Sequence, residues 1–136
     1  MRLLFLSQRV PFPPTKGDKL RSFHIIKFLA QRHAIDLACL TDTPADLKYE
    51  QELKQYCQSV MIVVLPALFS KIRAFLSLCS QLPFTCAYFS SKRLYELVAQ
   101  KLQMNHYDLL LAYCSSMAQY IEHIAQIPKV IDFVDV

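Results

Sequence analysis

One stretch near the amino end of the chain has the residue types that bind phosphate. It spans Lys16 to Asp18, with Gly17 at its centre, and lies between a proline-rich loop and a helical pattern. Glycine lets the backbone approach a ligand closely. The amino end of a helix offers unpaired N–H groups and the positive end of its dipole. The stretch predicts a site for a phosphate or diphosphate group. A turn that requires a positive φ explains Gly17 equally well, so both interpretations stay open.

A second set of polar side chains either lies on the first predicted helix or follows a later predicted strand. Its members are Arg21, His24, Tyr113, Ser115, Ser116, Asp132 and Asp135. Arg21 and His24 are one helical turn apart and could line a cleft or simply lie on the helix surface. The two serines could contact a ligand or act as helix N-caps. The two aspartates are the candidates for a catalytic role.

The elements that would position these residues alternate along the chain. Apolar, β-rich runs predict strands over 3–7, 35–40, 60–65, 108–112 and 130–133. Helical periodicity predicts helices over 19–32, 43–57, 68–79, 91–102 and 115–125. Strands that are apolar throughout are typical of a parallel sheet covered on both faces. Right-handed crossovers then give a doubly wound, Rossmann-like α/β fold with strand order 3-2-1-4-5. Its ligand site should lie where the order reverses, between strands 1 and 4.

Local signals refine this assignment. Asp18 and Ser91 are plausible N-caps, and Pro44 suits the first position of a helix. In the third helix, Leu68, Ile72 and Phe75 recur at helical spacing and predict an inward apolar face. The surrounding region, 65–89, carries only two charged residues, both basic. Packing in the core is one interpretation of this region, and contact with a membrane surface is the other.

Composition excludes several classes of protein. The chain has 136 residues, 54% hydrophobic and 19% charged, which suits one folded domain and excludes disorder. A single glycine excludes the usual dinucleotide fingerprint and a Walker A loop. The five scattered cysteines suggest neither zinc nor a disulfide framework, so we expect no metal and a reducing, cytoplasmic setting. The net charge is +4, and no nucleic-acid-binding motif accompanies it.

Four separated blocks resemble one family. They are PPTKGDKLRSFH at 13–24, LACLTDTPAD at 37–46, SSMAQY at 115–120 and VIDFVDV at 130–136. The stretch at 4–29 resembles the opening of family 4 glycosyltransferases. The four blocks more narrowly resemble bacterial sugar transferases associated with exopolysaccharide and PEP-CTERM sorting systems. The resemblance runs along essentially the whole chain.

The resemblance implies a retaining GT-B enzyme with two Rossmann-like domains that face each other across a cleft. This chain would be the amino-terminal, acceptor-side domain, incomplete after strand five, with the nucleotide sugar held mainly by a carboxyl-terminal domain that follows. Lys16 and Gly17 would then lie near the donor diphosphate, and no cofactor would be needed. The acceptor would be a glycan or lipid-linked sugar in polysaccharide biosynthesis, and peripheral contact with the inner face of the cytoplasmic membrane would follow. The fragment alone should be inactive.

The chain departs from that family at two places. Many members have paired glycines in the first loop, whereas this chain has only Gly17. Many have a His-Asp pair after the fifth strand, where this chain has Asp132 and Asp135. A stand-alone Rossmann-like module that binds a phosphorylated small molecule or a partner protein therefore stays an alternative. A receiver-type regulator is disfavoured, because its acidic cluster after the first strand is replaced here by a basic loop.

Overall fold

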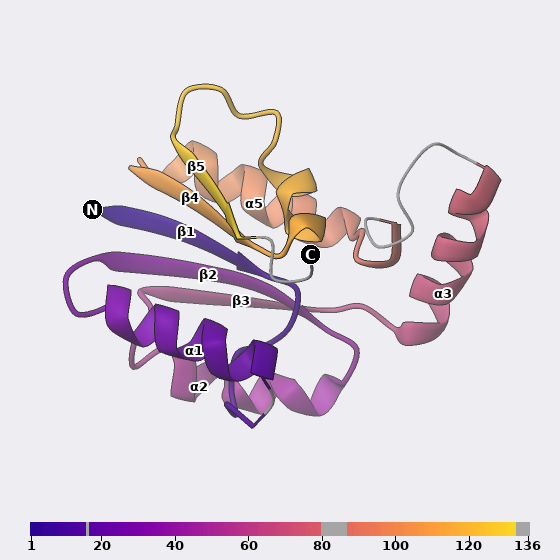
Figure 1. Cartoon of the computed structure of the whole chain (residues 1–136), viewed down its shortest axis with the longest axis horizontal. Helices are drawn as coiled ribbons and strands as arrows, with labels where there is room; N and C mark the ends of the chain where they lie inside the picture. Colours follow the sequence, from indigo (N-terminus) through magenta and orange to yellow (C-terminus); the bar gives the residue numbers. More distant parts are fainter. Residues whose placement is uncertain (16, 80–86, 133–136) are drawn as a thin grey trace.

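A five-stranded parallel sheet forms the centre of the computed structural model, which describes residues 1–15, 17–79 and 87–132. Its strands are β1 (Arg2–Ser7), β2 (Ala34–Thr41), β3 (Ser59–Val64), β4 (Leu109–Tyr113) and β5 (Lys129–Asp132). They lie in the order β3-β2-β1-β4-β5, and every neighbouring pair is parallel (Figure 1). The prediction of a Rossmann-like α/β fold with this strand order is confirmed.

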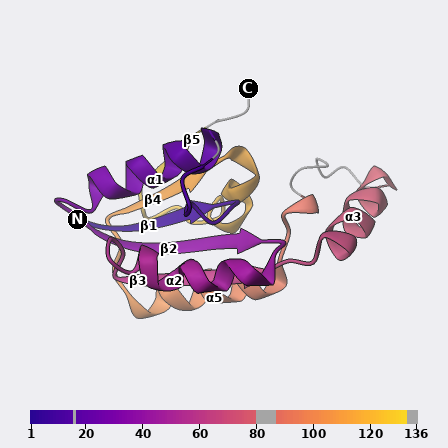
Figure 2. The same cartoon turned by 90° about the horizontal axis from the view of Figure 1, so that it is seen from below.

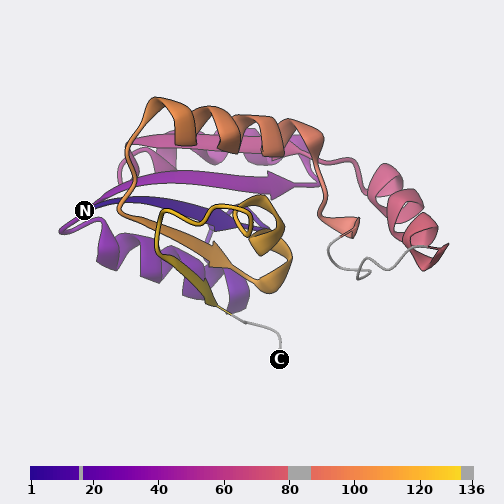
Figure 3. The ribbon, with the colours of Figure 1, turned by 90° about the horizontal axis from the view of Figure 1, so that it is seen from above.

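Helices cover both faces of the sheet because successive strand residues point to opposite sides. Leu3 and Phe5 of β1 pack on the face covered by α1 (Gly17–Leu29), η1 (Pro44–Tyr49) and α2 (Glu50–Leu53). Leu4 and Leu6 pack on the other face, under α5 (Lys92–Met104) and η3 (Ser115–Tyr120). Figure 2 and Figure 3 show these layers from below and above. Each face of the sheet therefore has its own apolar core.

Three helix starts test the predicted caps. Ser91 caps α5, since its Oγ accepts a hydrogen bond from the Leu94 N–H at 3.2 Å, as predicted. Asp18 is not the N-cap of α1, because the helix already begins at Gly17 and Asp18 lies in its first turn. Neither serine caps η3: Cys114 holds that position with φ 84°, and both serines belong to the helix.

The region from Pro44 onward forms 3-10 turns followed by a single α-helical turn, rather than the continuous helix predicted over 43–57. Pro44 does occupy the start, as predicted. The stretch from Ser115 is likewise a 3-10 helix of six residues. Both segments are short connections between longer elements, where 3-10 turns are common.

The orientation of the helix α3 (Ala67–Leu76) differs most from the prediction. Its helical periodicity is as predicted, but its large apolar side chains Leu68, Ile72 and Phe75 are exposed. The buried positions hold the small residues Ser70 and Ala74. All three ribbon views show α3 standing apart from the sheet, beyond the carboxyl ends of the strands (Figures 1, 2 and 3). Periodicity reveals an apolar stripe and not the surface that the stripe faces.

The amino ends of the strands are joined by a buried carboxylate. Asp36 of β2 accepts hydrogen bonds from Arg2 at 3.0 Å, from Ser59 Oγ at 2.8 Å and from the Tyr107 hydroxyl at 2.5 Å. Burial alone raises the pKa of Asp36, but the hydrogen bonds from Tyr107, Ser59 and Arg2 outweigh it and lower the pKa below its ordinary value. Burial, followed by the bond to Asp36, raises the pKa of Tyr107. This network ties β1, β2 and β3 to the segment that leads into β4.

Candidate functional site

Gly17 is the first residue of α1, at the carboxyl edge of the sheet. Its φ is not positive, so the interpretation that a turn requires glycine here is wrong. A Cβ built on Gly17 would meet no atom within 4 Å, so packing does not require glycine either. Close approach of a ligand to the backbone therefore stays a physical reason for this residue. Lys16, the other half of the predicted phosphate site, lies outside the described residues.

Asp18 closes the groove between β1 and β4. Its carboxylate lies 3.3 Å from Arg9 Nε and also accepts a hydrogen bond from the Lys19 N–H at 2.9 Å. Its carbonyl accepts a hydrogen bond from the Tyr113 hydroxyl at 3.2 Å. Tyr113 itself is buried, and this burial raises the pKa of its hydroxyl, so Tyr113 stays neutral and donates. Asp18 and Tyr113 thus fix the start of α1 against β4.

Arg21 joins α1 to the far edge of the sheet. Its guanidinium donates to Asp132 Oδ2 at 3.0 Å and lies 5.9 Å from the centre of the Tyr113 ring. The structure therefore brings together three of the predicted site residues. Both charges of the pair are partly exposed, so the pair contributes little to stability. Asp135, the other catalytic candidate, lies outside the described residues.

The remaining predicted residues separate from this cluster. Ser116 is buried and donates to the Gln8 side chain at 3.0 Å, which joins the loop after β4 to the loop after β1. Ser115 is exposed. His24 is exposed as well and packs edge-on against Phe23, and in the described part of the chain it makes no polar contact with the cluster. His24 is therefore a helix-surface residue.

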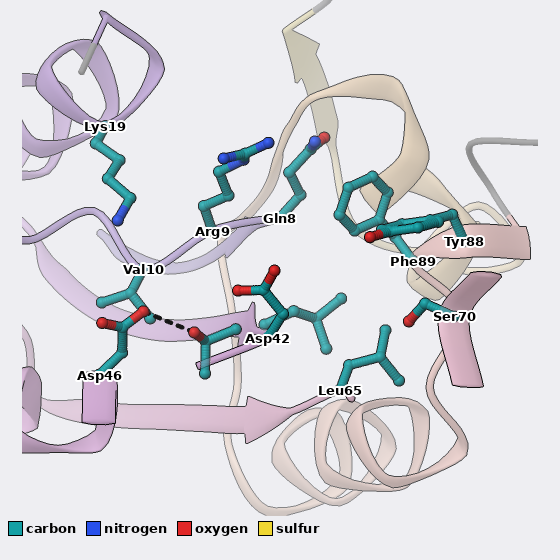
Figure 4. A pocket seen from close by; sticks show the side chains of 12 residues that line it. Gln8, Arg9, Val10, Lys19, Asp42, Asp46, Leu65, Ser70, Tyr88 and Phe89 are labelled. Atoms are coloured by element: carbon teal, nitrogen blue, oxygen red, sulfur yellow. Dashed lines mark hydrogen bonds between the residues drawn. The ribbon is translucent and has the colours of Figure 1, made fainter. Parts of the chain in front are cut away.

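One open cavity lies one strand away from the predicted switch point. Between β1 and β4, the described side chains leave no room for a water molecule, since Arg9, Asp18 and Tyr113 fill the groove. A cavity of about 90 Å³ opens instead beyond the carboxyl ends of β1, β2 and β3 (Figure 4). It is lined by Gln8, Arg9, Val10, Lys19, Leu40, Thr41, Asp42, Asp46, Leu65, Ser70, Tyr88 and Phe89. This cavity lies beside the position between strands 1 and 4 where the sequence predicts the site.

Charged residues of both signs line the cavity. Lys19 extends from α1 toward the side of Asp46, and Asp42 lies past the end of β2, whereas the Arg9 guanidinium extends away from Asp42 and pairs with Asp18 (Figure 4). Asp46 is held in place because its carboxylate accepts a hydrogen bond from Thr41 Oγ1 at 2.7 Å. Asp42 is exposed at the cavity wall and accepts a hydrogen bond from Thr43 Oγ1 at 3.1 Å. The lining can therefore donate hydrogen bonds from one side and accept them on the other.

Aromatic side chains and one buried hydroxyl form the third side of the cavity. Tyr88 and Phe89 lie together, with their ring centroids 4.9 Å apart, and the Tyr88 hydroxyl points into the open space (Figure 4). Ser70 is 1% exposed, and its Oγ has no hydrogen-bond partner among the described residues. A buried hydroxyl without a partner costs free energy that a bound polar ligand would recover.

The residues that line the cavity after β2 and on α3 were not among the predicted site residues. Residues Thr41 to Asp46 directly follow β2, and the predicted strand order already placed the end of β2 beside that of β1. The carboxyl ends of parallel strands meet at one edge, so this signal was present in the sequence. Ser70 was not predicted as a site residue, because the apolar stripe of its helix was expected to face inward and Ser70 lies on the opposite side.

Other reactive chemistry receives no support from the described residues. Cys39 and Cys57 are buried, and burial raises the pKa of the Cys57 thiol to about 12, so it stays protonated and a poor nucleophile. Within residues 1–15, 17–79 and 87–132, no three His, Cys, Asp or Glu side chains come together as metal ligands. In the same ranges no helix is both long and apolar enough to cross a bilayer.

A scan against protein-family models finds no match for the chain, and neither does a search of curated proteins or a search of solved structures.

Proposed function

We propose that the chain is the acceptor-side domain of a retaining glycosyltransferase. The complete enzyme would move a sugar from a nucleotide-sugar donor to a glycan or lipid-linked acceptor in polysaccharide biosynthesis. It would work in the cytoplasm, and a lipid-linked acceptor would bring it to the inner face of the membrane. The donor would be held mainly by a second Rossmann-like domain, so residues 1–136 alone should be inactive.

The cavity beyond β1, β2 and β3 carries this proposal. A sugar ring presents hydroxyls at its edge and C–H groups on its faces. Asp42 can accept hydrogen bonds from hydroxyls, Arg9 and Lys19 can donate to ring or hydroxyl oxygens, and Tyr88 can pack against a face. Opposite charges that nearly balance suit a neutral polar ligand better than a strongly charged one.

The edge of the cavity supports a role for the donor. Lys19 lies in the first turn of α1, whose N–H groups and positive dipole end suit a diphosphate leaving group. Stabilising that leaving group with helix N–H groups and cationic side chains is the electrostatic form of catalysis that requires no metal. The acceptor hydroxyl would lie near Asp42, which can orient it by accepting its proton in a hydrogen bond.

The same edge favours one alternative. A stand-alone module for a phosphorylated small molecule would also use the amino end of α1 with Arg9 and Lys19. Such a module would bind its ligand without any second domain. The two functions differ in which ligand the cavity takes: a neutral sugar for the transferase, and a phosphate ester for the module.

Sugar transfer tests the proposal directly. Full-length protein, joined to its donor domain, would be given radiolabelled UDP-, GDP- and ADP-sugars and membranes as the source of acceptor. Residues 1–136 would be assayed beside it. We expect label in the glycan or lipid fraction from the full-length form alone. Transfer from no donor, together with binding of a sugar phosphate by folded residues 1–136, would contradict the proposal and favour the module.

A further inference from the structure

The exposed face of α3 is too apolar for an ordinary protein surface. Of the 13 exposed large hydrophobic side chains among the described residues, six lie within positions 68–78. They are Leu68, Phe69, Ile72, Phe75, Leu76 and Leu78. A concentration of this kind marks a surface that binds something. In the ribbon views α3 extends from the body (Figures 1 and 3), and its large apolar side chains are exposed.

Basic residues border the apolar face on both sides. Lys71 lies three positions after Leu68 and four before Phe75, at one edge of the face. Arg73 lies four positions after Phe69 and three before Leu76, at the other edge. Both basic residues are exposed, and Arg73 also donates a hydrogen bond to the Ser90 carbonyl. An apolar stripe between two basic edges suits a helix lying in the plane of a lipid headgroup layer.

The two charged residues on α3 itself, Lys71 and Arg73, are both basic and indicate an anionic partner. From residue 53 to residue 95 the sequence contains five basic residues and no Asp or Glu. They are Lys54, Lys71, Arg73, Lys92 and Arg93. A surface with anionic headgroups would attract this region over a distance set by the ionic strength.

We propose that α3 docks the protein on an anionic lipid surface, with Phe75 and Leu76 in the boundary between headgroups and acyl chains. This docking does not depend on the proposed sugar transfer. The buried side of the same helix carries Ser70, which lines the cavity, so docking would hold the cavity next to the lipid surface. The small residues on that inner side let α3 approach the body closely while its large residues face outward.

Binding to vesicles of phosphatidylglycerol and of phosphatidylcholine, measured by co-sedimentation, tests the proposal. We expect binding to phosphatidylglycerol only, weakening as salt is raised. Phe75→Gln should weaken it about tenfold, because a buried aromatic ring contributes that much to transfer from water. Phe28→Gln is the matched control, since Phe28 on α1 is 72% exposed and Phe75 is 70% exposed. Equal loss in both variants, or equal binding to both lipids, would overturn the proposal.

Tryptophan fluorescence gives a second test that does not depend on affinity. The chain contains no tryptophan, so Phe75→Trp and Phe28→Trp each create a single reporter. Phosphatidylglycerol vesicles should shift the emission of the Phe75→Trp variant to shorter wavelength and leave the Phe28→Trp variant unchanged. A blue shift of Phe75→Trp that grows with protein concentration in the absence of lipid would instead assign the face to a second copy of the chain.

Discussion

Two aspartates of the same strand region have opposite surroundings. Asp36 lies near the start of β2, buried, with Arg2, Ser59 and Tyr107 as hydrogen-bond partners. Asp42 lies just past the end of β2, exposed at the wall of the cavity. The amino end of the sheet is thus joined by a satisfied polar network. The carboxyl end holds polar side chains around an open space.

This difference separates the groups that stabilise the fold from those available to a ligand. A buried carboxylate is tolerated only when partners satisfy it, and removing the carboxylate leaves those partners unpaired. A carboxylate at an open cavity wall can change without such a cost, because water replaces its partners. The buried Ser70 hydroxyl lies at the same cavity and has no partner in the described ranges, so it is available to a polar ligand at the carboxyl end.

The largest effect on stability should come from the amino end. Asp36→Ala would leave the Tyr107 and Ser59 hydroxyls and the Arg2 charge without their acceptor. We expect a loss of about 3–5 kcal/mol in the free energy of unfolding, measured by urea denaturation. Asp42→Ala is the matched control and should change that free energy by less than about 0.5 kcal/mol. Similar losses in the two variants would remove the contrast between the two ends.

Substitutions at the cavity should affect use of the acceptor more than they affect the stability of the fold. In the complete enzyme, Asp42→Asn and Tyr88→Ala should each lower kcat/KM for the acceptor roughly 10- to 100-fold, since each removes one contact with the sugar. The midpoint of urea unfolding should not move for Asp42→Asn, whereas Tyr88→Ala also removes the ring contact with Phe89 and should lower it. Arg21→Gln serves as the comparison, because Arg21 is bound to Asp132 outside the cavity, and its acceptor kinetics should stay near those of the unchanged protein. Normal acceptor kinetics in both cavity variants would exclude this cavity as the acceptor site.

Low pH should reduce the contribution that the Asp36 network, at the amino ends of the strands, makes to the stability of the fold. Hydrogen bonds lower the pKa of Asp36 below its ordinary value of 3.8, so its contribution to stability is complete above pH 3.8 and is lost as the pH falls through the lowered pKa. The slope is at most about 1.4 kcal/mol per pH unit for one proton. Asp36→Asn cannot titrate, so its deficit relative to the unchanged protein should shrink below pH 3.8. A deficit of equal size at pH 3 and pH 7 would contradict this role.

The sequence predicted the sheet better than it predicted the site. The apolar strands β1 to β5 and the helical spacing between them are local patterns that repeat along the chain. Together with right-handed crossovers, they predict the strand order. The location of the cavity depends instead on how side chains fill the edge of the sheet. Arg9 and Asp18 are nine positions apart in the sequence, and no local pattern predicts that they pair and close the groove at β4.

The predicted orientation of α3 was wrong for a related reason. The spacing of Leu68, Ile72 and Phe75 is the same whether the stripe faces a core or a lipid surface. Its small-residue side, with Ser70 and Ala74, carries the complementary information, since small residues allow a helix to approach a surface closely. The small residues on one side of the helix therefore favour the observed orientation. The sequence from 53 to 95 also contains no acidic residue.

The smallest effect on the fold, and a decisive one for the phosphate site, should come from Gly17→Ala. Gly17 has no positive φ, begins α1, and leaves space for a Cβ, so alanine should keep the stability unchanged or raise it by up to about 1 kcal/mol. Transfer should nevertheless fall, with a higher KM for the nucleotide sugar, if the backbone at this residue approaches the donor diphosphate. Thermal unfolding and donor kinetics of the same preparation separate the two effects. Alanine that leaves both unchanged would exclude Gly17 from the phosphate site, and the proposed donor contacts would then fall to Lys19 and the other N–H groups of the first turn.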